Sequence, residues 1–244
     1  MIPKIIHYCW LSDDPVPNNM QRYMKTWYEK LPDYEFMLWN FDRFPKEQSL
    51  WVKQAFENRK YAFAADYIRL YALYHYGGIY LDMDVEVLKS YNPLLKMPAM
   101  LCFEANGHTI EAATMGAEKG AEWVKACLDY YKGRPFINED GSFNMKPIPQ
   151  IMQELLSMNF VIQEVRGLSD VEKTTIPILP SEYFSPRSYS TDELNLTKNT
   201  YSIHQFSGSW LPWYVKAERA FSRFLGIRYR DFLNRHINQK KQRL

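Results

Sequence analysis

One segment in the first third of the chain constrains the fold more than any other. Over 61–76, aromatic and aliphatic side chains recur at i, i+4, i+7 and i+11, which predicts a helix. Two glycines at 77–78 follow and can supply the left-handed residue that commonly ends a helix. The apolar run 79–81 then predicts a short buried strand, and Asp82 and Asp84 come directly after it.

The rest of the chain extends this pattern. Strand-like runs at 2–10 and 34–39 flank a helix-like stretch at 18–30, which indicates a βαβ unit and a mostly parallel sheet. We expect further helices over 50–58, 121–131 and 147–158, and further strands over 99–103, 174–179 and 201–204. These elements predict a single-domain α/β fold whose Rossmann-like, mostly parallel sheet is flanked by helices.

Charge is spread unevenly along the chain. The net charge is only +2, yet residues 213–244 hold nine Lys and Arg against two Asp and Glu. We expect two basic amphipathic helices there, as an extension of the domain formed by 1–212. Such helices can lie on an anionic membrane, or they can pack on the core with a solvated basic face. Nucleic-acid binding is not expected, because the remainder of the chain is acidic.

The cysteines and the start of the sequence indicate a reducing compartment. Cys9, Cys102 and Cys127 are far apart and form no C-x-x-C pair, which argues against a disulfide framework. The sequence does not open with a basic segment followed by a long apolar run, and it contains no apolar run long enough to span a bilayer. We therefore expect a cytoplasmic protein.

Asp82 and Asp84 are the first candidates for chemistry. In an extended segment, residues i and i+2 point to the same side, so the two carboxylates should converge. Convergence of two acids is unfavourable unless a cation or a proton lies between them. Oxygen ligands suit Mg²⁺ or Mn²⁺, and such an ion keeps positions open for substrate phosphates. A D-x-D pair by itself is also common in ordinary turns, so its context decides.

Asp66 and Arg69 supply that context. They stand at i and i+3 on the predicted helix and therefore share a face. A guanidinium in this position can hold phosphate oxygens or orient the acid beside it. The alternative is a plain ion pair within the helix.

Residues 64–84, AADYIRLYALYHYGGIYLDMD, resemble the D-x-D core of glycosyltransferase family 32. The D-x-x-R, the double glycine and both acids stand at matching spacing. The opening IPKIIHYCW at 2–10 is similar to the first strand of that family. The resemblance extends to a late segment, HQFSGSW at 204–210. The family includes yeast-type initiating mannosyltransferases and bacterial capsule enzymes. It is similar, more distantly, to the glucosylating domains of large clostridial toxins.

The resemblance implies a GT-A fold, a nucleotide-sugar donor, a divalent cation and retention of anomeric configuration. It also implies roles for four residues. Asp84 would ligate the metal together with Asp82, and Asp82 would also contact the ribose and the sugar of the donor. Asp66 and Arg69 would hold hydroxyls of the donor sugar, and with Asp82 they form the expected catalytic set.

Five further residues complete the expected donor site. Trp10 would stack on the nucleobase, and His7 is placed in the same site, with a hydrogen-bonded role in the core as its alternative. His204 is a candidate metal ligand through an imidazole nitrogen, or else a structural histidine beside a turn. Ser209 and Trp210 would donate to phosphate oxygens through the hydroxyl and the indole N–H.

Together these features predict a glycosyltransferase that depends on Mn²⁺ or Mg²⁺. We expect it to move a hexose, with UDP-galactose or UDP-glucose favoured, onto a glycan or a lipid-linked oligosaccharide in surface polysaccharide synthesis. A place in the bacterial cytoplasm, peripheral on the inner face of the plasma membrane, fits the basic tail. Two alternatives stay open. One is a nucleotidyl- or phosphotransferase, which also pairs acids around a metal, and the other is a carbohydrate-binding protein without turnover.

Overall fold

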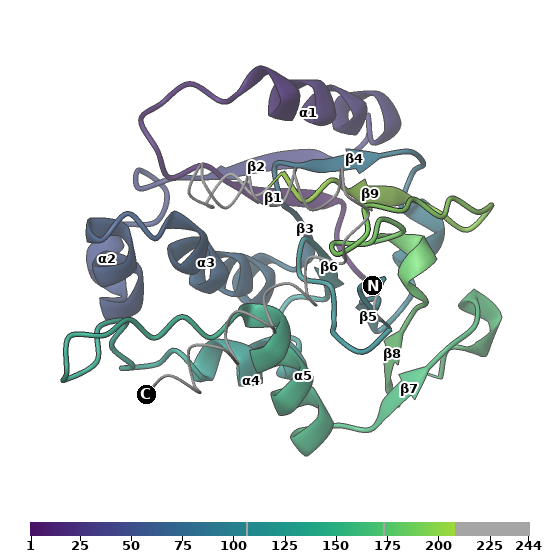
Figure 1. Ribbon diagram of the computed structural model, residues 1–244. Helices are drawn as coiled ribbons and strands as arrows, with labels where there is room; N and C mark the ends of the chain where they lie inside the picture. The colour runs from purple at the N-terminus through teal and green to yellow at the C-terminus, as the bar shows by residue number, and fades with distance from the viewer. Residues whose placement is uncertain (106, 173, 208–244) are drawn as a thin grey trace, which may run out of the picture.

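The computed structural model describes residues 1–105, 107–172 and 174–207 and shows a mixed α/β fold (Figure 1). The helices and strands are β1 (Ile5–Cys9), α1 (Asn18–Lys30), β2 (Glu35–Trp39), α2 (Leu50–Glu57), α3 (Tyr61–Tyr76), β3 (Gly78–Leu81), β4 (Val85–Val87), β5 (Ala99–Met100), β6 (Thr114–Ala117), α4 (Glu122–Asp129), α5 (Ile148–Asn159), β7 (Ile162–Glu164), β8 (Ile176–Ile178) and β9 (Ser202–His204). Four short 3-10 helices accompany them, namely η1 (Lys46–Gln48), η2 (Asn92–Leu94), η3 (Leu168–Asp170) and η4 (Ser181–Tyr183).

The central sheet has the strand order β2-β1-β3-β6-β5. Strand β1 pairs in parallel with β2 and β3, whereas β6 pairs antiparallel with both β3 and β5. Strand β5 therefore runs in the same direction as β1, β2 and β3, and β6 alone of these five runs the other way. The prediction of a mostly parallel sheet flanked by helices is confirmed.

Apolar side chains on the two faces of this sheet form two separate cores. Tyr80 of β3 packs in the core shared with α2, α3, α4 and α5, while its neighbours Ile79 and Leu81 pack in the core shared with α1. Side chains of a strand alternate between faces, so successive residues of β3 contribute to different cores. Figure 1 shows the resulting layers, with α1 on one side of the sheet and α3, α4 and α5 on the other.

The connection from α3 to β3 needs glycine. Gly77 and Gly78 have φ of 66° and 104°, which is the left-handed region that other residues avoid. A Cβ on Gly78 would lie 2.6 Å from the carbonyl oxygen of Ile5 on the neighbouring strand. The chain can therefore leave α3 and enter the sheet beside β1 without an intervening loop, which fixes the helix relative to the end of β3.

The small sheet β4-β9 lies over the α1 side of the molecule. Helix α1 packs against β4, and the indole of Trp27 donates to the carbonyl oxygen of Val85 at 2.7 Å. Strand β9 pairs antiparallel with β4, so the late part of the chain returns to the residues that directly follow Asp84. A second small sheet pairs β7 with β8 in parallel.

Three strands of the structure were not predicted, namely β4, β6 and β7. Strand β6, Thr-Met-Gly-Ala, carries neither a β-branched run nor an alternating pattern, and its pairing with β3 and β5 determines its conformation. The strand predicted over 99–103 is shorter in the structure, where β5 ends at Met100. The two tail helices predicted within 213–244 lie outside the described residues. Within the described part of the chain, the helices lack the length and apolarity that crossing a bilayer requires.

Candidate functional site

Asp82 and Asp84 lie in a turn at the carboxyl end of β3. We predicted an extended segment here, and that was wrong, because the N–H of Val85 donates to the carbonyl oxygen of Asp82 at 3.0 Å and closes a turn. The carboxylates still converge, for a different reason. The turn leads the chain back into β4 and keeps both acids at the carboxyl end of β3.

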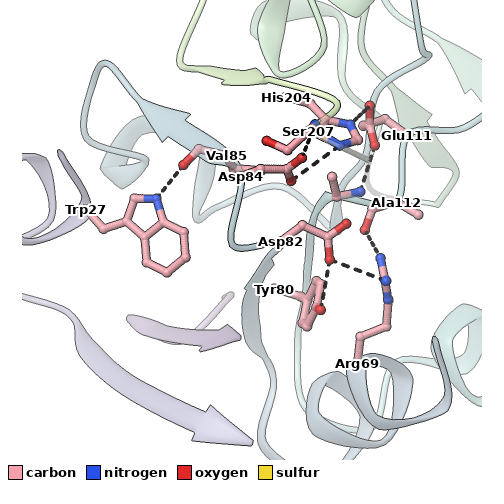
Figure 2. Close-up of polar contacts among 11 residues, drawn as sticks. Trp27, Arg69, Tyr80, Asp82, Asp84, Val85, Glu111, Ala112, His204 and Ser207 are labelled. Carbon is pink, nitrogen blue, oxygen red and sulfur yellow. Dashed lines mark hydrogen bonds and ion pairs between the residues drawn. The ribbon is translucent and has the colours of Figure 1, made fainter. Parts of the chain in front are cut away.

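His204 reaches the two acids through the pairing of β4 with β9. Val85 and His204 are register partners, so the histidine stands beside the acidic turn although 120 residues of sequence separate it from Asp84. Each of Asp82, Asp84 and His204 offers one ligand atom, and these atoms lie within 4.8 Å of one another. Figure 2 shows the three side chains directed toward a common region. Two carboxylate oxygens and an imidazole nitrogen form a donor set that fits Mn²⁺ or Mg²⁺.

Asp84 is oriented from two sides. The backbone N–H of Ser207 donates to Oδ2 of Asp84 at 2.7 Å, and Nε2 of His204 lies 3.6 Å from the other oxygen, Oδ1. The N–H of Gln205 also donates to the backbone carbonyl of Asp84 at 3.1 Å. Residues 204–207 therefore hold the Asp84 carboxylate in position. They belong to the segment 204–210 that resembles family 32.

Arg69 lies beneath this turn and joins α3 to it. Its Nη2 lies 3.1 Å from Oδ1 of Asp66 and 3.3 Å from Oδ1 of Asp82, and its Nη1 donates to the carbonyl oxygen of Ala112 at 2.8 Å. The hydroxyl of Tyr80 donates to the same oxygen of Asp82 at 2.9 Å, and the guanidinium stands over the Tyr80 ring. The arrangement is more than an ion pair within a helix, because one guanidinium holds acids from α3 and from the end of β3. Figure 2 shows its contact with Asp82.

The site carries an excess of negative charge. Burial raises the pKa of Asp66 to about 7 and also raises the pKa of Asp82, in both cases against the opposing effect of Arg69. Burial lowers the pKa of His204, but the field of Glu111 and Asp84 outweighs it and raises this pKa to about 9. Carboxylates with raised pKa values beside a histidine that attracts a proton indicate a site that a divalent cation would stabilise.

Glu111 belongs to this cluster, and the sequence analysis missed it. Burial alone would raise its pKa, but the charge and hydrogen bond of His204 lower the pKa of Glu111 to about 2. The residue stands alone between Ile110 and two alanines, in no motif. The one signal in the sequence is that an acid within an apolar stretch must find a partner if it is buried.

Two predicted donor-site residues near β1 differ in their surroundings. His7 is 0% exposed, and both of its ring nitrogens have partners, since Nε2 lies 2.7 Å from the carbonyl oxygen of Gly77 and Nδ1 accepts from the indole of Trp39 at 3.1 Å. This corresponds to the core alternative for His7 and leaves neither nitrogen for a ligand. Trp10 is half-buried just past β1, and its indole donates to the carbonyl oxygen of Asp14 at 2.8 Å.

Ser209 and Trp210 lie outside the described residues.

Next to the end of β1, the carboxyl end of β2 opens into a hollow of about 460 Å³ lined by Leu38, Asn40, Asp42 and Arg43. The ends of β1, β2 and β3 form one edge of the sheet, the edge at which open α/β sheets bind ligands. The hollow, Trp10 and the acidic turn therefore share that edge.

Comparison with known families agrees with this geometry. Residues 17–100 match the family described as glycosyltransferase sugar-binding region containing DXD motif. The matched region contains Asp66, Arg69, Asp82 and Asp84. The predicted relationship to D-x-D glycosyltransferases is confirmed over this region.

Curated relatives show the same relationship over a similar length. The chain is 38% identical over 105 residues to mannosyl phosphorylinositol ceramide synthase SUR1 of Saccharomyces cerevisiae, a match that covers 41% of this chain and 27% of the relative. It is 36% identical over 102 residues to inositol phosphoceramide mannosyltransferase 3 of Schizosaccharomyces pombe, covering 40% of this chain and 28% of the relative. The matched segment thus spans little more than a quarter of these relatives.

Among solved structures, the chain is similar to the PaToxG glycosyltransferase. The sequence identity is 18%, the TM-score is 0.49, and the match covers 64% of this chain and 68% of the other.

Proposed function

We propose that this protein is a divalent-metal-dependent glycosyltransferase, because residues 17–100 match the glycosyltransferase sugar-binding region that contains a DXD motif. It moves a hexose from a nucleoside diphosphate sugar to a hydroxyl group of a glycan or lipid-linked acceptor. One observation carries the proposal, namely the convergence of Asp82, Asp84 and His204 on one region next to the buried guanidinium of Arg69. A sugar diphosphate needs both a cation for its phosphates and polar groups for its hydroxyls.

Asp84 and His204 would hold the metal, together with an oxygen of Asp82. The N–H of Ser207 orients the Asp84 carboxylate, so the ligand is preorganised before a cation arrives. A bound divalent cation supplies charge neutralisation for the diphosphate leaving group. The family match supports dependence on a divalent metal, and Mn²⁺ is our specific expectation.

Asp66, Arg69 and Asp82 would hold the sugar. Arg69 fixes the two carboxylates by contacts of 3.1 and 3.3 Å, so that their remaining lone pairs can accept from donor hydroxyls. The positive guanidinium would also stabilise the negative charge that develops on the departing phosphate, which would lower the barrier. The burial of Arg69 and Asp66 strengthens the contact between them, because the local dielectric is low.

The nucleotide would extend along the sheet edge toward β1 and β2. Trp10 offers a half-buried indole for stacking on the base, and the hollow at the end of β2 offers an amide, a carboxylate and a guanidinium from Asn40, Asp42 and Arg43. Ser209 and Trp210 would donate to the phosphate oxygens through the hydroxyl and the indole N–H. By analogy with family 32, UDP is our specific expectation for the nucleotide, and retention is our expectation for the configuration at the anomeric carbon.

The relatives bear on the sugar and the acceptor. Their names describe mannosyl transfer to inositol phosphoceramide, which supports mannose among the hexoses and a lipid-borne hydroxyl as acceptor. From the sequence we expect galactose or glucose, a role in bacterial surface polysaccharide, and contact of the basic tail with the inner face of the plasma membrane. These finer assignments stay part of the proposal.

Product analysis tests the proposal. The protein is incubated with Mn²⁺ and a panel of UDP- and GDP-sugars, including the mannose, galactose and glucose donors, and the products are identified by mass spectrometry. A glycosyltransferase breaks the bond between the anomeric carbon and the diphosphate, so slow hydrolysis releases a nucleoside diphosphate and free sugar. Release of a nucleoside monophosphate and a sugar phosphate would instead indicate a nucleotidyl- or phosphotransferase. Tight binding of a sugar without turnover of any donor, even with glycan acceptors present, would indicate a carbohydrate-binding protein.

A further inference from the structure

Glu111 stands behind His204, on the side away from Asp84. We propose that Glu111 is a positioning residue, which holds the His204 imidazole with Nε2 directed toward the metal and with its proton on Nδ1. This inference rests on the proposed function, because it requires His204 to be a metal ligand. It adds to the site a residue that lies outside the region matched by the family.

The contacts of Glu111 use both of its carboxylate oxygens. Oε1 accepts from the backbone N–H of Ala113 at 2.7 Å, and Oε2 lies 3.1 Å from Nδ1 of His204. The residue is only 2% exposed, so water cannot replace either partner. On the far side of the same imidazole, Nε2 lies 3.6 Å from Oδ1 of Asp84 (Figure 2).

The contact with Glu111 determines which nitrogen of the His204 imidazole can bind a metal. A neutral histidine carries a proton on one ring nitrogen and a lone pair on the other, and only the lone pair can bind a metal. A carboxylate accepts hydrogen bonds and donates none, so Glu111 selects the form with the proton on Nδ1. The lone pair then lies on Nε2, beside Asp84. Metal-binding histidines are commonly held by a carboxylate in this way.

The segment that carries Glu111 also holds the other half of the site. The carbonyl oxygen of Ala112 accepts from Arg69 at 2.8 Å, and that of Ala113 accepts from the backbone N–H of Asp82 at 2.8 Å. Residues 111–113 therefore set the relative positions of His204, Arg69 and the acidic turn. Glu111 is the member of this segment that acts through a side chain, and so it can be changed without altering the backbone contacts.

The variant Glu111→Gln isolates the effect. The glutamine oxygen can continue to accept from Ala113, which turns the amide NH₂ toward Nδ1 of His204. That nitrogen must then accept, so the proton moves to Nε2 and blocks the lone pair that the metal needs. We expect the affinity for Mn²⁺ to fall by about 10- to 100-fold, the usual effect of removing such a partner.

Mn²⁺ binding to the full chain is measured by electron paramagnetic resonance of the free ion. Pulsed measurements on the bound ion then report nitrogen coupling from a histidine ligand, which a loss of packing alone would not remove while Mn²⁺ stays bound. The matched control is Glu86→Gln. It removes one negative charge from β4, where Glu86 accepts from Gln205, and no contact joins its side chain to His204 among the described residues. Thermal melting confirms that each variant is folded.

A double-mutant cycle with His204→Gln completes the test. The inference predicts weaker nitrogen coupling and weaker Mn²⁺ binding in Glu111→Gln, near wild-type behaviour in Glu86→Gln, and no further loss when Glu111→Gln is added to His204→Gln. Wild-type affinity and coupling in a folded Glu111→Gln protein would overturn it. So would an equal loss of affinity in the His204→Gln background, which would show that Glu111 does not act through the histidine. If wild type itself bound no Mn²⁺, the proposed metal-dependent function would fall as well.

Discussion

The guanidinium of Arg69 lies 3.3 Å from the Asp82 carboxylate, and the nitrogen that makes this contact also lies 3.1 Å from Asp66. The side chains of Arg69 and Asp66 are 6% and 9% exposed, whereas that of Asp82 is 29% exposed. Helix α3 and the end of β3 are thus held together by one cation shared between two acids. Removal of that cation would leave the buried carboxylate of Asp66 and the partly buried carboxylate of Asp82 without its positive charge.

The variant Arg69→Met tests this relationship. We expect the free energy of unfolding to fall by about 3–5 kcal/mol, the usual cost of removing one partner of a buried ion pair. Urea denaturation followed by circular dichroism measures the change. Lys125→Met serves as the control, because Lys125 pairs with Asp129 at the surface, where water screens the contact and its loss should change stability far less. Equal losses in the free energy of unfolding would show that the buried contacts of Arg69 contribute no more to stability than a surface ion pair.

Gly78→Ala should disrupt the junction of α3 and β3. The new Cβ would lie 2.6 Å from the carbonyl oxygen of Ile5 on β1, and the residue would keep a φ of 104° that alanine avoids. Overpacking and backbone strain each cost about 1–3 kcal/mol, so we expect a combined loss of about 3 kcal/mol or more. The control Gly120→Ala has a similar φ of 75° with nothing within 4 Å, and should show the strain alone. Thermal unfolding of both variants separates the two effects, and a Gly78 variant no less stable than the control would refute the clash.

His7 should make folding stability depend on pH. Burial lowers its pKa from 6.5 to about 4, so the unfolded chain takes up a proton in a range where the folded protein does not. Stability from this source is therefore present above pH 6.5, is lost as the pH falls, and changes little below 4. The shift corresponds to about 3 kcal/mol at most.

The difference between wild type and His7→Gln isolates this contribution, because the other titrating groups are common to both proteins. Chemical denaturation at pH 7.5, 6, 5 and 4 should show the stability advantage of wild type shrinking as the pH falls. An advantage that stays constant over this range would mean that the folded state does not exclude the proton.

Helical periodicity and glycine placement allowed much of the fold to be predicted. Helices α1 and α3 begin and end at the predicted residues, because apolar side chains recur at regular spacing and glycine stops α3. The short strands were harder. Strand β6 takes its conformation from its neighbours in the sheet, and a sequence pattern of four residues does not reveal a neighbour.

For the candidate site too, residues close in sequence could be predicted, and contacts between distant residues could not. Asp66, Arg69, Asp82 and Asp84 lie within 19 consecutive residues, so their association could be inferred from one segment. Glu111 could not be found in this way, because its role depends on meeting His204 across 93 residues of sequence. His7 shows the converse limit, since a histidine on a buried strand near a site looks the same in sequence whether it faces a ligand or the core.

The most direct test of the account is donor turnover by the Asp84→Asn variant, with and without Mn²⁺. Asparagine keeps an oxygen that can accept from Ser207, so the fold should persist while the charge at the metal position is lost. Glu86→Gln is the control, with the same loss of one charge on β4. We predict that Mn²⁺ stimulates nucleoside diphosphate release by wild type and the control. Release by Asp84→Asn should be lower by about a hundredfold or more, since metal stabilisation contributes several kcal/mol. Turnover by Asp84→Asn at the wild-type rate, or wild-type turnover unaffected by removing the metal with EDTA, would contradict the metal-dependent mechanism.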